Sequence, residues 1–270
     1  MPGYRAFDAA RSAGKAQKRA AVDALLGRID RADDVDSYRL ADSLVGHLEA
    51  ICRHANTQAG AKLLGKLATY YLISGNGVAA EVSCRQLIQL IQTLFGPDYP
   101  DGLICISNLA SALRAQGKTE EARQLLCSLV RRSSRVLGPD HPQTLSSLNQ
   151  FADTLRAQGR LRTSSKLHKR VLSRRRQLLG EDASDTLTSM SNLAGTLREL
   201  GDFDTARALQ GTVLDVVRRA SGEDHFETLV AKDNLAETLR SKGELREALS
   251  LQQDVVKGFS ALFGDAPRKA

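Results

Sequence analysis

One loop recurs along the chain at an unvarying interval of 42 residues. The segment LGPDHPQTL begins at Leu137, and related segments begin at Phe95 (FGPDYPDGL), Leu179 (LGEDASDTL) and Ser221 (SGEDHFETL). A shorter version, FGDAPRKA, begins at Phe263. A fixed period of about 20–50 residues is typical of repeat proteins, in which small units stack on one another. The period therefore predicts a stack of similar units, with this loop as the connection between them.

Each period contains the pattern of a first amphipathic helix. An apolar residue followed by alanine recurs in every unit, and a leucine follows four residues after the apolar one, as on one face of a helix. The apolar positions are Leu109, Phe151, Leu193 and Leu235. A glycine comes next, as is common where a helix ends. These glycines are Gly117, Gly159, Gly201 and Gly243.

A second helix follows in each unit. It begins with a small residue, which lets two helices approach closely, at Ala122, Ser164, Ala206 and Ala248. The glycine of the recurring loop suits its end, and Pro100 and Pro142 suit the first position of the next helix, where a missing N–H costs nothing. The chain lacks Trp and has only 4% aromatic residues, which also favours helix over sheet.

The predicted fold is an all-α solenoid of antiparallel helix pairs in one continuous stack. We expect five pairs within residues 57–262, at about 61–94, 101–136, 143–178, 185–220 and 227–262. Residues 1–56 are predicted to form an N-terminal helical cap, with about the first 16 residues allowed to be disordered. Residues 263–270 form a tail.

The helix pair with L-A-x-x-L, then Gly, then Ala five positions on, resembles the tetratricopeptide repeat. The 42-residue version, with N-L-A and a loop like LGPDHPxTL, resembles the kinesin-light-chain type, over about residues 61–262. The resemblance implies a right-handed superhelix whose first helices line a concave, peptide-binding face. Gln150, Phe151 and Ser164 depart from the pattern, as does Lys66, and these departures affect the implied peptide contacts at the N-terminal end more than the fold.

An amide side chain precedes the apolar position of the first helix in four of the five predicted pairs. These residues are Asn108, Gln150, Asn192 and Asn234. An amide offers both donors and an acceptor, so it can pair with an extended peptide backbone of any sequence. The resemblance implies this ligand-binding role. The alternative is that the amides bond the neighbouring helix and maintain the stack.

An arginine follows on the same four first helices, six residues after the amide. These residues are Arg114, Arg156, Arg198 and Arg240. Guanidinium groups at regular intervals suit an acidic peptide, because each can bind a carboxylate in a bidentate manner. The alternative is an ion pair between repeats, for instance with Asp153 or Glu237.

A basic run from Arg156 to Arg176 contains no acidic residue. Arg170, Arg174, Arg175 and Arg176 are its candidate anion-binding residues. The run predicts either a solvated outer helix face or contacts with nucleic acid or an anionic surface. It lacks the interleaved aromatic residues that stack on single-stranded bases, so nucleic acid is the less favoured partner.

Catalytic and cofactor-binding patterns are absent. GAKLLGK (60–66) resembles a phosphate-binding loop, but Leu67 follows where Ser or Thr is needed, and we expect helix there. The five histidines are scattered, and His141 and His225 share one loop position, which suggests loop stabilisation. The four cysteines lack CxxC spacing, so we expect buried thiols in a reducing compartment and neither a metal nor a cofactor.

We therefore expect a non-enzymatic, cytoplasmic scaffold that binds a peptide or helical segment of a partner protein, favouring acidic ligands. No apolar run is long enough to span a membrane. The formal charge of +7 agrees with acidic partners. Two alternatives are anion binding through the basic run and a role as the sensor part of a larger signalling protein. Oligomerisation through the C-terminal repeat would cover its outer face.

Overall fold

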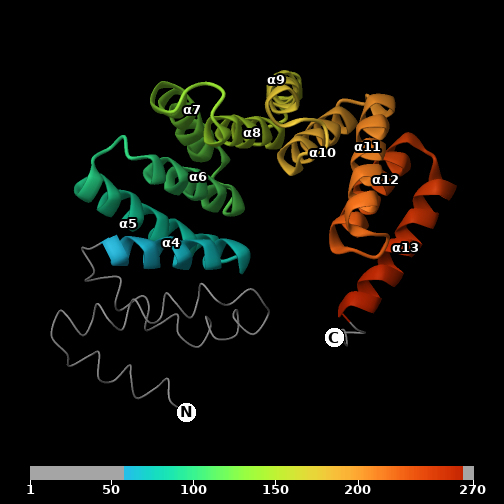
Figure 1. The fold of residues 1–270 in the computed structure, drawn as a ribbon, viewed down its shortest axis with the longest axis horizontal. Coiled ribbons are helices and arrows are strands. Elements are labelled where there is room, and N and C mark those ends of the chain that lie inside the picture. The colour runs from blue at the N-terminus through green and yellow to red at the C-terminus, as the bar shows by residue number, and fades with distance from the viewer. Residues whose placement is uncertain (1–57, 264–270) are drawn as a thin grey trace, which may run out of the picture. The chain divides into compact units, whose positions relative to one another are not determined.

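The structure, a computed structural model, describes residues 58–263 (Figure 1). Within this range the regular structure consists of α-helices, and the all-α class is confirmed. They are α4 (Gln58–Ile73), α5 (Gly77–Phe95), α6 (Pro100–Ala115), α7 (Thr119–Val136), α8 (Pro142–Ala157), α9 (Leu161–Leu179), α10 (Ser184–Glu199), α11 (Phe203–Ser221), α12 (Phe226–Lys242) and α13 (Leu245–Phe263). The predicted N-terminal cap, Cys52, and residues 264–270 of the tail lie outside the described residues.

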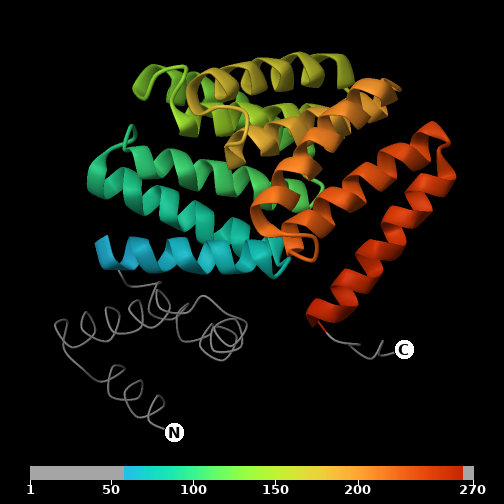
Figure 2. The same ribbon diagram turned by 45° about the vertical axis from the view of Figure 1, so that its right-hand side comes forward.

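The chain divides into two compact units, Met1–Pro139 and Asp140–Ala270. In the first, α5 packs against both α4 and α6, and α6 packs against α7. In the second, α9 packs against α8 and α10, and α11 against α10 and α12, while α13 covers α12. Figures 1 and 2 show the last pair, coloured orange to red, as antiparallel neighbours. Continuity of the stack across residue 139 stays a prediction.

The recurring apolar residues form the core of the helix pairs. The alanines of the first helices, which follow the apolar position, are completely buried at Ala110, Ala152, Ala194 and Ala236. The leucines one turn later are buried as well, whereas Phe151 is half-buried. Ser164 is also completely buried, and its hydroxyl donates to the carbonyl oxygen of Ala152 over 2.7 Å. The departing residue Ser164 therefore keeps the close helix approach and satisfies its own hydroxyl.

The recurring loop ends one helix and starts the next. Gly180 has φ 89° and ψ 174°, a region that is essentially restricted to glycine, and its N–H donates to the carbonyl oxygen of Arg176. Pro142 occupies the first turn of α8, as the sequence predicts. His141 caps the same helix, because its Nδ1 accepts from the N–H of Gln143 over 3.1 Å. His225 caps α12 in the same way, so these two histidines stabilise loops.

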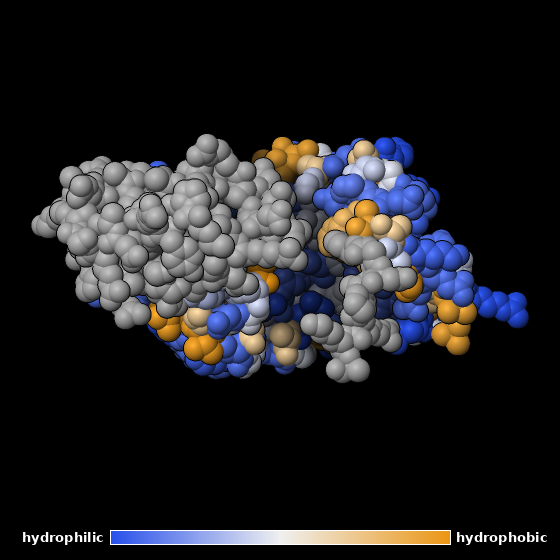
Figure 3. Space-filling model, turned by 90° about the horizontal axis from the view of Figure 1, so that it is seen from below, coloured by the Kyte–Doolittle hydropathy of each residue, from blue (hydrophilic) through white to orange (hydrophobic). Residues whose placement is uncertain are grey.

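One face of the described residues shows the distribution of polar and apolar side chains (Figure 3). On the face drawn in Figure 3, hydrophilic side chains predominate and hydrophobic ones lie in small separate patches. No helix among residues 58–263 is both long and apolar enough to cross a membrane.

Candidate functional site

The four amide side chains, the amide row, lie at one repeated position of the first helices. Asn108 lies on α6 of the first unit, and Gln150, Asn192 and Asn234 lie on α8, α10 and α12 of the second. Within the second unit, α10 contacts both α8 and α12, so these three amides occupy matching places on adjacent helices. All four side chains are half-buried. The fold therefore presents a row of partly exposed amides at the repeat interval.

The asparagine side chains of this row take no part in the hydrogen bonds that hold the described helices together. Within the described chain, the side chains of Asn108, Asn192 and Asn234 form no hydrogen bond with another protein group. Gln150 differs, because this residue has an interaction partner within the protein. A half-buried amide has both its donors and its acceptor to satisfy. The three asparagines can thus accept and donate bonds to a ligand without breaking any bond of the stack.

The four arginines at the repeated position, the arginine ladder, lie at one edge of an exposed strip of the first helices. The amides lie at the other edge of that strip. Six residues separate each arginine from its amide, which places the two about 120° apart around the helix axis. On α10, exposed Thr188 and Glu199 lie in the strip between Asn192 and Arg198. Gly195 lies there too and has no side chain, so the backbone of α10 is accessible beside Asn192.

Two of the ladder arginines form ion pairs between repeats. Arg156 Nη1 of α8 lies 2.7 Å from Glu199 Oε1 of α10, and Arg198 of α10 pairs with Glu237 of α12. For Arg156 and Arg198, the ion-pair alternative describes the observed geometry. Arg240 is 61% exposed and approaches only Glu237 of its own helix, at 3.9 Å. Arg114 is half-buried and forms no ion pair within the described residues. The ladder thus divides into two bridging arginines and two that are available to a ligand.

Part of the basic run is already bound by loop acids. Arg174 donates through Nε to Asp140 Oδ1 over 2.7 Å, and a second nitrogen donates to Oδ2. This contact lowers the pKa of the Asp140 carboxyl below its usual range. Arg176 lies 3.0 Å from Glu181 of the following loop. Both arginines therefore hold loops against α9, and an anion would have to compete with these carboxylates.

Arg175 differs from the anion-binding residue expected from the sequence, because its side chain is only 3% exposed. Its guanidinium donates to the carbonyl oxygen of Asp185 and to the hydroxyls of Ser189 and Ser146, each over 2.9 Å. Burial lowers its pKa. The signal in the sequence was its spacing: Arg175 follows Val171 by four residues on the buried stripe of α9. Arg175 is thus a packing residue that no external anion reaches.

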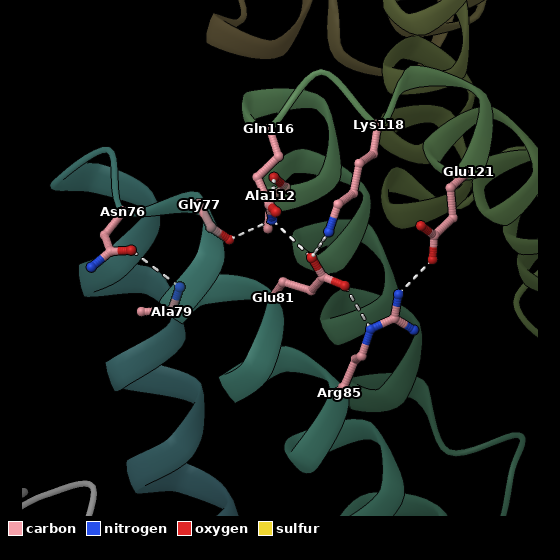
Figure 4. Close-up of polar contacts among 9 residues, drawn as sticks. All are labelled: Asn76, Gly77, Ala79, Glu81, Arg85, Ala112, Gln116, Lys118 and Glu121. Carbon is pink, nitrogen blue, oxygen red and sulfur yellow. Dashed lines mark hydrogen bonds and ion pairs between the residues drawn. The ribbon is translucent and has the colours of Figure 1, made fainter.

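A polar network in the first unit was missed by the sequence reasoning. Glu81 of α5 accepts hydrogen bonds from Lys118 Nζ (2.7 Å), Gln116 Nε2 (2.8 Å) and Arg85 Nε (2.9 Å), as Figure 4 shows. These bonds, led by that from Lys118, lower the pKa of Glu81 to about 2. Arg85 continues the network to Glu121 of α7. The network joins consecutive repeats, and acids and cations 36–37 residues apart were its only signal.

A buried histidine was also missed. His168 is completely buried, with Nδ1 3.0 Å from Asn149 Oδ1 and Nε2 3.5 Å from Asp153 Oδ1. Because solvent does not reach the ring, it has no route to a substrate. The described range 58–263 holds no group of three or more His, Cys, Asp or Glu residues placed to bind a metal.

The cysteines of this range are free thiols. Cys84 and Cys105 are buried, and Cys127 is half-buried. Burial raises the pKa of Cys84 to about 11 and that of Cys105 to about 12. Both thiols are therefore protonated and unreactive at neutral pH. The GAKLLGK segment lies inside helix α4, with Leu64 and Leu67 buried, and thus does not form a phosphate-binding loop.

Comparison with known proteins identifies the repeat. A family model of the tetratricopeptide repeat matches residues 61–133, 127–177, 149–209 and 185–261. No curated protein sequence matches the chain.

Solved structures with similar folds include a putative kinesin light chain from Podosopora anserina with nearly identical repeats. It is 23% identical, with a TM-score of 0.61, and the match covers 75% of this chain and 96% of that one. BtubC (BKLC) from P. vanneervenii is 17% identical with a TM-score of 0.63, covering 93% and 95%. A Rap protein in complex with competence and sporulation factor is 16% identical with a TM-score of 0.57, covering 84% and 64%.

Proposed function

The chain belongs to the tetratricopeptide-repeat family, in its kinesin-light-chain-like form, and we propose that it binds an extended segment of a partner protein on the amide row of its first helices. The fold is generally a non-enzymatic scaffold for protein–protein interaction. The Rap structure, which has a similar fold, holds a bound factor. The proposed site comprises Asn192 and Asn234, together with Gln150 on the preceding first helix.

The observation that carries the proposal is the state of Asn192 and Asn234. Both amides are half-buried on adjacent helices, and neither bonds to the rest of the described protein. Each can accept from a peptide N–H and donate to a peptide carbonyl. Pairing with the peptide backbone needs no particular side chain, so the amides supply affinity, and neighbouring groups supply specificity.

The charges around the row support an acidic ligand. Arg240 is well exposed beside this face, and its nearest acid lies 3.9 Å away. It can bind a carboxylate through two parallel N–H bonds. Arg156 and Arg198 instead bridge adjacent first helices and hold the amides at a constant separation. Asn108 and Arg114 occupy the same positions in the first unit and are proposed to play the same parts there. The buried free thiols support a cytoplasmic location.

The test is a comparison of partner recovery from nuclease-treated native lysate. The wild-type chain and the Asn192→Ala/Asn234→Ala variant are immobilised in equal amounts, and bound proteins are identified by mass spectrometry. The matched control is Ser250→Ala/Gln253→Ala, two exposed residues of α13. We expect a partner that the control retains and the asparagine variant loses. Equal recovery on all three proteins would contradict the proposal.

A second variant blocks the site without removing a polar group. Gly195→Gln adds a side chain to the exposed strip beside Asn192, where the nearest atom to a new Cβ would be Arg156 Nη1 at 3.6 Å. Glutamine is a much better helix former than glycine, so any loss of binding would not come from a weakened helix. We expect Gly195→Gln to lose the same partner. Retention of that partner would show that it binds elsewhere.

A further inference from the structure

The second unit has another candidate binding surface. It lies between the second helices α9 and α11 and includes one residue of α10. An open hollow of about 450 Å³ is lined by Leu172 of α9, Leu193 of α10 and Leu209 of α11. Leu172 and Leu193 are buried, and Leu209 is half-buried. Lys169 and Arg176 of α9 also line it. The hollow therefore combines an apolar floor with a basic edge.

The basic edge continues along α9. Arg162, Lys166 and Lys169 follow one another at four and three residues, which places them in one row along the helix. All three are exposed, and none forms an ion pair within the described residues. Helix α9 contains no acidic residue. The row thus carries positive charge that the fold does not neutralise, in contrast to Arg174 and Arg176.

The next repeat provides an internal comparison. Positions 42 residues later lie on α11, α12 and α13, where Leu214, Leu235 and Leu251 repeat the three leucines. There the residues equivalent to Lys169, Ser173 and Thr205 are Gly211, Asp215 and Glu247. The lining residues Arg176 and Gln177 correspond to Arg218 and Arg219, so the eight lining positions carry two positive charges in the first groove and no net charge 42 residues later. The basic character therefore belongs to the α9–α11 groove and is not a general property of the fold.

We propose that the α9–α11 groove binds an acidic amphipathic helix of a partner protein. An apolar stripe on that helix would pack on the leucine floor, and its carboxylates would face Lys169, Lys166 and Arg162. Acidic residues spaced at four and three match the row on α9. A protein ligand suits the groove better than nucleic acid does, because leucines form its floor and no aromatic residue lines it for base stacking. None of the four amides lines this groove, although Leu193 of α10 directly follows Asn192.

The experiment is a selection with a phage-displayed library of helical peptides of ~16 residues, using the purified wild-type chain as target. We expect the enriched peptides to carry Asp and Glu on one face and Leu, Ile or Met on the other. The most enriched peptide is then labelled, and its affinity is measured by fluorescence anisotropy. We expect the affinity to fall as the salt concentration rises, because exposed charges are screened.

Three variants locate the peptide. Lys166→Glu/Lys169→Glu reverses the row and should weaken binding by about 10-fold or more, since like charges then face each other. Arg246→Glu/Lys257→Glu makes the same charge change on exposed residues of α13 and should leave binding unchanged. Asn192→Ala/Asn234→Ala should also leave it unchanged, so failure at this groove and failure at the amide row are distinguishable. A Lys-for-Glu version of the peptide should recover binding to the reversed row.

Several results would overturn the proposal. One is a selection that enriches no acidic amphipathic peptide. Another is a peptide that binds the Lys166→Glu/Lys169→Glu variant as tightly as the wild type. Single-stranded RNA and phosphatidylserine vesicles are tested in parallel. Tighter binding of either to the wild type, lost in the same variant, would reassign the groove to nucleic acid or to a membrane surface. Circular dichroism of each variant checks that the helices remain intact.

Discussion

At the scale of single residues, the polar groups that hold the repeats together differ from unit to unit. Glu81 is only 14% exposed and is bound by two cations and an amide, whereas Glu121 is half exposed and pairs with Arg85. A mostly buried carboxylate depends on its partners, because they replace the water it has lost. Glu81 should therefore contribute measurably to the stability of the first unit, and Glu121 should contribute little.

The first prediction concerns Glu81 and pH. Its pKa is lowered from 4.5 to about 2 in the folded state. A lowered pKa means that its stabilisation is fully present above pH 4.5 and is lost as the pH falls toward 2. Glu81→Gln should lower the free energy of unfolding at pH 7 by about 1–3 kcal/mol. Between pH 4.5 and 2, the free energy of unfolding of the variant should decrease less with falling pH than that of the wild type. Chemical denaturation at several pH values measures both effects.

Glu121→Gln is the control for this prediction. We expect it to change the free energy of unfolding by less than about 1 kcal/mol, because its carboxylate is exposed. If Glu81→Gln retained the wild-type slope between pH 4.5 and 2, other carboxyl groups would be responsible for the acid sensitivity.

The second prediction concerns Ser164, whose equivalents are Ala122, Ala206 and Ala248. Ser164→Ala removes both the hydroxyl and its bond to Ala152, while the carbonyl keeps its helical partner, so we expect a cost of about 1 kcal/mol or less. Ser164→Val adds volume where two helices meet and should cost about 1–3 kcal/mol. Thermal unfolding of both variants checks this order. A more stable valine variant would contradict the tight packing seen at this residue.

At the scale of the elements, each second helix must lie close to the first helix of its own pair. Gly258 of α13 marks such an approach, because a Cβ there would lie 2.5 Å from Leu229 Cδ2 of α12. Leu229 is completely buried, so its side chain is surrounded by other protein atoms. Gly211 of α11 occupies a similar mid-helix place, but a Cβ there would meet no atom within 4 Å. Both glycines lie inside a second helix, but only Gly258 is in close contact with another helix.

The third prediction uses this contrast. Gly211→Ala should raise the free energy of unfolding by about 0.5–1 kcal/mol, because alanine loses less backbone entropy in a helix. Gly258→Ala should lower it by about 1–3 kcal/mol through overpacking. Urea denaturation of the two variants under the same conditions measures the difference. Stabilisation by Gly258→Ala would mean that α13 can shift away from Leu229 at no cost.

At the scale of the whole molecule, the described chain is a series of helix pairs, and within each of the two compact units neighbouring helices pack on one another. Stability in such proteins is distributed over local interfaces and not over one central core. The ion pairs Arg156–Glu199 and Arg198–Glu237 and the network at Glu81 are all contacts of this local kind. A change in one pair should therefore be felt mainly by that pair and the next.

The fourth prediction follows from this organisation. Hydrogen exchange of Gly258→Ala should show faster exchange of the amides of α12 and α13, with little change in α4 and α5. The reason is that local opening depends on nearby contacts. Peptide-resolved mass spectrometry measures both segments in one experiment. A uniform increase along the chain would instead indicate that the protein unfolds as a single cooperative unit.

The sequence by itself determined the fold class, the repeat and the helix-capping residues. The reason is that these depend on local chemistry and on spacing: the stripe of Leu109 and Leu113, the proline at the start of α8 and the glycine at position 180 act within a few residues of themselves. Repetition then made the signal stronger, because one misread unit is outweighed by the others. The amide row was also placed on the first helices by spacing alone.

Only the tertiary structure decided which polar side chains bond to other protein groups and which stay exposed to solvent. Arg156 and Arg240 have the same place in their repeats, yet one bridges two helices and the other is exposed. Arg175 and Arg176 are neighbours, yet one is buried among Ser146, Ser189 and Asp185 while its neighbour pairs with a loop acid. Such differences depend on partners from other helices, and long flexible side chains can reach several of them. Residue type and spacing set what each side chain can do, and the packed neighbours select which of these it does.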